Sequence, residues 1–174
     1  VPIVANSMGG YWAMAFALAF PARVTKLVLV GEPAGSAPVP SLMHRLMGPP
    51  LVGPLLYATI SKPSPRATRE SLRRMLVANP GRVPREWIDC AYAAAALPGA
   101  TQSWLTMLRT VTRVLGPADL TFALRPELPR LATPTLFLWG TADHILSEAY
   151  GRAYCAAIAG ARFETIERAG HYPH

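Results

Sequence analysis

A serine, an aspartate and a histidine each follow a short segment whose pattern is typical of a strand. Ser7 comes directly after an apolar run, Asp143 lies in the turn GTAD after TLFLW, and His171 lies in AGHYPH. A serine hydroxyl is a poor nucleophile at neutral pH unless a neutral imidazole accepts its proton. A carboxylate hydrogen-bonded to that imidazole fixes its tautomer and stabilises its charged form. The three residue types therefore suit nucleophilic catalysis by the serine.

The small residues around Ser7 indicate an unusually sharp turn. Ala5 precedes the serine by two positions, and Gly9 and Gly10 follow it. A strand that reverses directly into a helix leaves space only for small neighbours and holds the serine in a strained conformation. The pattern is the nucleophile elbow G-x-S-x-G, with Ala5 in place of the first glycine. The backbone N–H of Met8 is then expected to donate one of the two hydrogen bonds of an oxyanion hole, whereas no segment matches the loop that supplies the other.

Each candidate also has a plainer interpretation. Ser7 could be an ordinary turn serine, Asp143 could only begin a helix, and His171 could have a structural role. Glu32 follows the second apolar segment and is an alternative acid. Two other histidines are expected to be neighbouring surface or supporting groups: His144 and His174.

The candidate residues need a scaffold, and the chain contains four short apolar or β-branched runs that are predicted strands: Pro2–Ala5, Lys26–Val30, Thr135–Trp139 and Arg162–Ile166. The last run is the most polar and alternates, so it is expected near an edge of the sheet. Helices are expected over Tyr11–Phe20 and Glu148–Ile158, the second capped by Ser147. This alternation predicts a doubly wound α/β fold with a mostly parallel sheet. The candidate residues then follow strands at the carboxyl edge, where such folds place their binding crevices.

The region between the second and third predicted strands has a different composition. Prolines are frequent in its first half, and three amphipathic helices are predicted after them: Arg66–Ala78, Arg85–Leu97 and Thr101–Leu115. We interpret an all-helical insertion between two strands of a sheet as a cap. The predicted organisation is therefore 1–35 for the core with the elbow, 36–124 for the helical cap, and 125–174 for the core with acid and base.

Composition excludes several classes of protein. With 174 residues, 51% of them hydrophobic and 16% charged, the chain can form a single apolar core. Its net charge of +7 comes from scattered arginines, whereas a nucleic-acid interface would require a clustered basic stripe. No apolar run reaches the ~18 residues needed to cross a bilayer. Cys90 and Cys155 lie among alanines and suggest neither a disulfide framework nor a metal site.

Four segments together resemble the C-terminal two-thirds of an α/β-hydrolase-fold serine hydrolase: ANSMGG, YWAMAFALAFPARVTKLVLVG, PTLFLWGTADHI and AGHYPH. The order Ser…Asp…His is the order of that family. The resemblance implies that Ser7 is the nucleophile, Asp143 the acid and His171 the base, with no cofactor and no metal. The wording N-S-M-G-G is similar to that of carbon–carbon bond hydrolases that cleave ring-fission products of aromatic catabolism. That subfamily often carries tryptophan after its histidine, where this chain has Tyr172.

The sequence therefore predicts a serine hydrolase that acts on a small or medium apolar carbonyl compound, such as an ester, a lactone or a vinylogous diketone. A cofactor-free perhydrolase would use the same triad. A non-catalytic binding module on the same fold is the alternative from another class. The expected partner is a small-molecule substrate, with neither nucleic acid nor a membrane, and a homo-oligomer is left open. The expected location is the cytoplasm.

The chain enters a predicted strand at once and lacks an initiating methionine, so we interpret it as a piece of a longer hydrolase. In the family that it resembles, further strands and the second oxyanion-hole donor would lie upstream of Val1. One edge of the predicted sheet is then bare and apolar, which favours pairing with another chain. The piece alone is expected to be unstable or nearly inactive.

Overall fold

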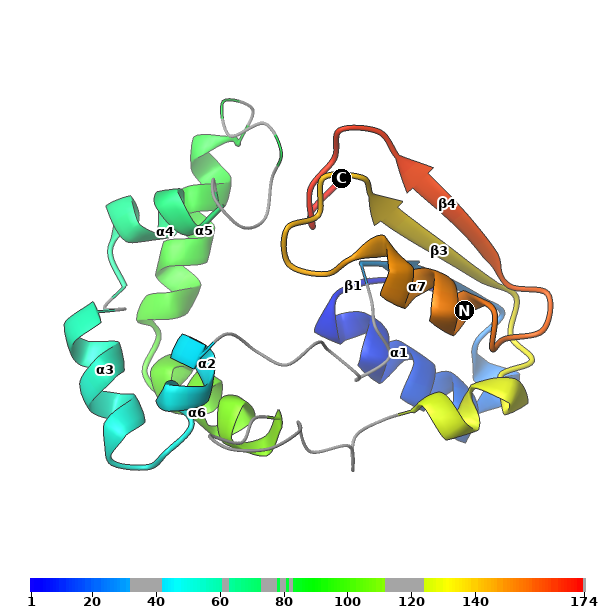
Figure 1. Ribbon diagram of the computed structural model, residues 1–174, viewed down its shortest axis with the longest axis horizontal. Helices are drawn as coiled ribbons and strands as arrows, with labels where there is room; N and C mark the ends of the chain where they lie inside the picture. Colours follow the sequence, from blue (N-terminus) through cyan, green and yellow to red (C-terminus); the bar gives the residue numbers. More distant parts are fainter. Residues whose placement is uncertain are drawn as a thin grey trace. The chain divides into compact units, whose positions relative to one another are not determined.

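The computed structural model describes residues 1–31, 42–60, 63–72, 78, 81, 83–111 and 124–173. These residues belong to two compact units (Figure 1). The first unit contains a parallel sheet with the helices α1 and α7, and the second contains the helices α2 to α6.

Within the described residues, the sheet of the first unit has four strands in the order β1-β2-β3-β4, and every neighbouring pair is parallel: β1 (Pro2–Asn6), β2 (Lys26–Val30), β3 (Thr135–Gly140) and β4 (Arg162–Ile166). The predicted parallel α/β architecture is confirmed. The polar run Arg162–Ile166 forms an edge strand, as its alternation predicts. Among the described residues β1 forms the opposite edge, and its Val4 is 73% exposed.

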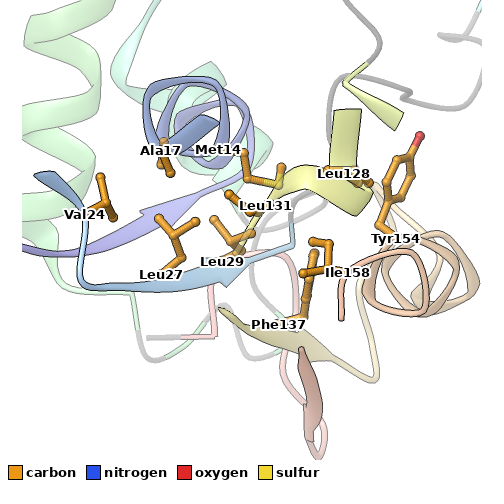
Figure 2. Close-up of a cluster of buried hydrophobic side chains, with 11 residues drawn as sticks. Met14, Ala17, Val24, Leu27, Leu29, Leu128, Leu131, Phe137, Tyr154 and Ile158 are labelled. Carbon is orange, nitrogen blue, oxygen red and sulfur yellow. The ribbon is translucent and has the colours of Figure 1, made fainter. Parts of the chain in front are cut away.

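One face of the sheet carries the apolar core of this unit. Leu27, Leu29 and Phe137 point to the same side of β2 and β3, and each is at most 1% exposed. Met14 of α1 and Ile158, just after α7, pack into the same cluster (Figure 2). Burying this apolar surface is what holds the helices to the sheet. The packed core therefore fixes the strand ends after which the candidate residues lie.

Both predicted helices of this unit form, with shifted ends. Helix α1 spans Met8–Ala19, so it begins immediately after Ser7 rather than at Tyr11. Helix α7 spans Glu148–Cys155, and a turn follows where the prediction continued to Ile158. The hydroxyl of Ser147 accepts a hydrogen bond from the N–H of Ala149 at 3.4 Å, which confirms the predicted cap. Among its described residues this unit also contains two short 3₁₀ helices: η1 (Pro21–Arg23) and η5 (Arg125–Arg130).

The described part of the second unit consists of helices and the turns between them: α2 (Leu42–Met47), α3 (Val52–Ile60), α4 (Pro65–Ser71), α5 (Arg85–Ala96) and α6 (Ala100–Val111). Met47, Leu105 and Leu108 form its buried centre. Helices therefore form where the three amphipathic patterns predict them, although residues 73–77 and 112–115 of those patterns lie outside the described residues. The assignment of 36–124 as a cap stays a prediction. None of the described helices is both long and apolar enough to cross a bilayer.

Candidate active site

The three candidate residues lie beyond the carboxyl ends of three parallel strands. Ser7 follows β1, Asp143 follows β3 and His171 follows β4. Since all four strands run in the same direction, these ends lie at one edge of the sheet. Open parallel sheets bind their ligands at this edge.

The backbone of Ser7 has the strain expected of a nucleophile elbow. Its φ is 48° and its ψ is −128°, a conformation that L-residues rarely adopt. The N–H of Ser7 donates to the carbonyl of Val30 at 2.8 Å, and its own carbonyl accepts from Gly10 at 2.8 Å. An ordinary N-cap serine has an extended φ and accepts a hydrogen bond from the first helical turn, but the Ser7 side chain makes no such bond to α1. This geometry argues against an ordinary capping serine.

Asp143 and His171 form a buried pair. Nδ1 of His171 lies 2.8 Å from Oδ2 of Asp143, and their side chains are 3% and 1% exposed, respectively. The other carboxylate oxygen, Oδ1, accepts hydrogen bonds from the N–H groups of Ile145 at 2.8 Å and Leu146 at 2.9 Å. The carboxylate is thus held by the backbone on one side and faces the imidazole on the other. When Nδ1–H donates to Asp143, the neutral ring presents a basic nitrogen at Nε2.

Two glycines let the chain pack closely around this pair. Gly31, directly after β2, has a φ of +57°, and a Cβ placed there would lie 3.0 Å from Nδ1 of His171 and 3.5 Å from Oδ2 of Asp143. A Cβ on Gly140 would lie 2.2 Å from the carbonyl oxygen of Gly170. The loop that contains His171 therefore packs directly against the backbone at the end of β3. Gly31 is not among the site residues predicted from the sequence. Its position immediately after a buried strand is the signal that could have found it.

Two polar side chains beside the candidates were also missed as site residues. The side-chain amide of Asn6, the last residue of β1, donates to the backbone carbonyl of His171 at 3.1 Å. The ring of Tyr172 stacks on that of His171, with 5.6 Å between centroids and 27° between planes. Burial raises the pKa of Tyr172 above its ordinary value, so this phenol keeps its proton at neutral pH. An asparagine at the end of an apolar strand is itself an anomaly that could have indicated a role.

The remaining sequence candidates have the following positions. Met8 is the first residue of α1, directly after Ser7, where its N–H could take part in an oxyanion hole. His144 is exposed, as expected of a surface group. Glu32 and His174 lie outside the described residues. Within the part of the chain that the structure describes, no group of three or more histidine, cysteine, aspartate or glutamate side chains could hold a metal ion.

Sequence comparison finds a match to the model of the "Alpha/beta hydrolase family" over residues 2–174. Two similar curated proteins are named 2-hydroxy-6-oxononadienedioate/2-hydroxy-6-oxononatrienedioate hydrolase. The one from Cupriavidus pinatubonensis is 29% identical over 181 residues, and the one from Paraburkholderia xenovorans is 31% identical over 178 residues. Each match covers 99% of this chain and 56% of the relative, so the chain spans little more than half the length of these proteins.

Solved structures show the same fold. The 2-hydroxy-6-oxo-6-phenylhexa-2,4-dienoate hydrolase of Rhodococcus sp. strain RHA1 superposes with a TM-score of 0.71 at 23% identity, covering 98% of this chain and 57% of that one. A putative lipase from Acinetobacter baumannii AYE gives a TM-score of 0.72 at 21% identity, covering 99% and 55%. These two neighbours share one fold, although their names indicate different reactions.

Proposed function

The chain belongs to the alpha/beta hydrolase family, and from this premise we propose that the protein is a serine hydrolase with Ser7 as nucleophile, His171 as general base and Asp143 as the acid that orients it. The observation that carries the proposal is the buried pair of Asp143 and His171, 2.8 Å apart, at the same sheet edge as a serine with a φ of 48°. A merely structural ion pair would not require a strained serine at the end of a neighbouring strand.

The proposed reaction begins when the Ser7 hydroxyl attacks a substrate carbonyl carbon and Nε2 of His171 takes the hydroxyl proton. The negative charge that develops on the carbonyl oxygen is stabilised by the N–H of Met8 and a second donor. The tetrahedral intermediate collapses as His171 gives the proton to the leaving group, which departs and leaves an acyl-enzyme. Water, activated by His171, then releases the acid product and restores the serine.

The proposed substrate is a small or medium apolar carbonyl compound: an ester, a lactone, or a ketone whose adjacent carbon–carbon bond is cleaved. The names of the two curated relatives support the carbon–carbon bond, since both are hydrolases of 2-hydroxy-6-oxo compounds. An ester substrate stays a second possibility, because one structural neighbour is named as a putative lipase. A location in the cytoplasm and the absence of nucleic-acid partners stay predictions.

The experiment that tests the proposed nucleophile is labelling of the whole protein that carries this chain with a fluorophosphonate probe, followed by mapping of the modified residue. We expect labelling at Ser7 that disappears in Ser7→Ala and persists in Ser103→Ala, a matched control at an exposed serine of α6. Absence of labelling in the unsubstituted protein would contradict a serine hydrolase and favour a binding module on the same fold. Turnover of aryl esters, lactones and a vinylogous diketone by the same preparation then separates the substrate classes.

A further inference from the structure

We propose that Asn6 is a positioning residue that holds the loop of His171 in register with the turn of Ser7. This inference rests on the proposed function, because it concerns the distance between the proposed base and the proposed nucleophile. Asn6 is half-buried at the end of β1 and immediately precedes Ser7 in the chain.

The side-chain amide of Asn6 donates two hydrogen bonds to carbonyl groups of different segments. Its Nδ2 lies 3.0 Å from the carbonyl oxygen of Val30 and 3.1 Å from that of His171. Both partners can only accept, so the NH₂ group must face them and the orientation of the amide is unambiguous. The amide thus connects the end of β2 to a backbone group that is 165 positions away from Asn6.

The same carbonyl of Val30 also accepts the N–H of Ser7 at 2.8 Å. Asn6 and Val30 are register partners in the ladder of β1 and β2, so this carbonyl is a fixed point of the sheet. The elbow and the Asn6 amide are therefore anchored to one atom. A displacement of the His171 backbone relative to Ser7 would have to stretch or break this pair of hydrogen bonds.

Asn6 complements the contact that Asp143 makes with the imidazole. Asp143 orients the ring through Nδ1 and belongs to the turn after β3. That contact sets the tautomer and rotation of the ring, whereas the Asn6 amide fixes the backbone of His171 relative to β1 and β2. Proton transfer from a hydroxyl to an imidazole is sensitive to this separation, because a misplacement of about 1 Å can reduce a rate about 10²-fold.

The test compares Asn6→Ala and Asn6→Asp with the unsubstituted whole protein. Alanine removes the NH₂ group that makes both hydrogen bonds, and aspartate keeps the shape but places one carboxylate oxygen against the two carbonyl oxygens. We expect the second-order rate of fluorophosphonate labelling at Ser7 to fall about 10- to 100-fold in both. The pH midpoint of labelling in Asn6→Ala should stay unchanged, because the pair of Asp143 and His171 is intact. Labelling at the unsubstituted rate in either variant would overturn the proposal.

Thr135→Val is the matched control for loss of a buried side-chain-to-backbone hydrogen bond. The hydroxyl of Thr135 donates to the carbonyl of Thr133 at 2.7 Å at the opposite end of β3 from the site. We expect this variant to lose thermal stability without a change in the labelling rate. If Thr135→Val slows labelling as much as Asn6→Ala does, general destabilisation explains both variants and the positioning role is wrong.

A measurement that needs no activity separates this inference from the proposed function. The ¹³C carbonyl resonances of Val30 and His171 should both shift in Asn6→Ala, and the side-chain amide hydrogens of Asn6 should exchange slowly in the unsubstituted protein. Unshifted resonances or rapid exchange would overturn the Asn6 contacts, even if Ser7 is labelled. Shifted resonances in a protein that is never labelled at Ser7 would instead support the Asn6 contacts and contradict the proposed function.

Discussion

Nδ1 of His171 and Oδ2 of Asp143 lie 2.8 Å apart, although the residues are 28 positions apart and follow different strands. The pair is almost completely removed from solvent. A buried carboxylate is costly unless hydrogen bonds compensate it. Here two backbone N–H groups and the imidazole surround Asp143, so its position depends on a correctly folded loop between β3 and α7.

Replacement of the acid should remove most of the proposed activity. Asp143→Asn keeps the shape of the side chain, but its amide can donate to Nδ1 and would then stabilise the wrong tautomer of His171. We expect turnover of an activated ester to fall about 10⁴-fold, the effect known for this exchange in a serine protease triad. His144→Gln, at the exposed neighbouring histidine, should leave turnover unchanged. Equal losses in the two variants would contradict the assignment of Asp143.

Gly31→Ala should damage the site as well as the fold. A Cβ at this position meets the His171 ring at 3.0 Å, and the positive φ of +57° adds about 1–2 kcal/mol of backbone strain. Gly160→Ala is a matched control, since its φ is +72° and its Cβ would enter open space. Urea unfolding should show a loss of stability in both variants. Only Gly31→Ala should lose labelling at Ser7. Full labelling of Gly31→Ala would contradict this prediction and show that the His171 ring can move away from the added methyl group.

Trp139→Phe should loosen the loop that carries Asp143. The buried indole N–H of Trp139 donates to the carbonyl of Leu146 at 3.0 Å, and the N–H of Leu146 donates to Asp143. Phenylalanine leaves the carbonyl of Leu146 without the indole N–H donor, so we expect the free energy of unfolding to fall by about 1–3 kcal/mol in urea titrations. Trp12→Phe, at a tryptophan that is 60% exposed, should change it by less than about 0.5 kcal/mol.

The phenol of Tyr172 should ionise only at high pH. Burial raises its pKa because the charged form is poorly solvated. A difference titration of the unsubstituted protein against Tyr172→Phe, followed by phenolate absorbance, isolates this group and should show a midpoint above the ordinary value of about 10. The raised pKa also means that stability from this residue is present below the unfolded pKa and is lost as the pH rises through the folded pKa. An ordinary or lowered midpoint would indicate that the ring is not buried.

Much of the fold could be predicted from local patterns. Short runs such as KLVLV and TLFLW are typical of strands buried on both faces, and they form β2 and β3. The three candidate residues each follow a predicted strand, and this position alone predicts that they lie at one edge of the sheet. The start of α1 was wrong by three residues, because the helix begins within the elbow itself, among the glycines that usually weaken a helix.

The contacts among these candidate positions depend on the folded chain. Residue order does not reveal that Gly31 must lack a side chain for His171 to fit, or that Asn6 bonds to the carbonyl of a residue 165 positions later. Such contacts follow from the register of parallel strands and from the packing of the loops beyond them. Residue types and spacing were thus enough to predict a candidate nucleophile, base and acid at one edge of a parallel sheet. Their pairing and support came from tertiary packing, since long-range distances are set by strand register and by the burial of side chains from distant segments.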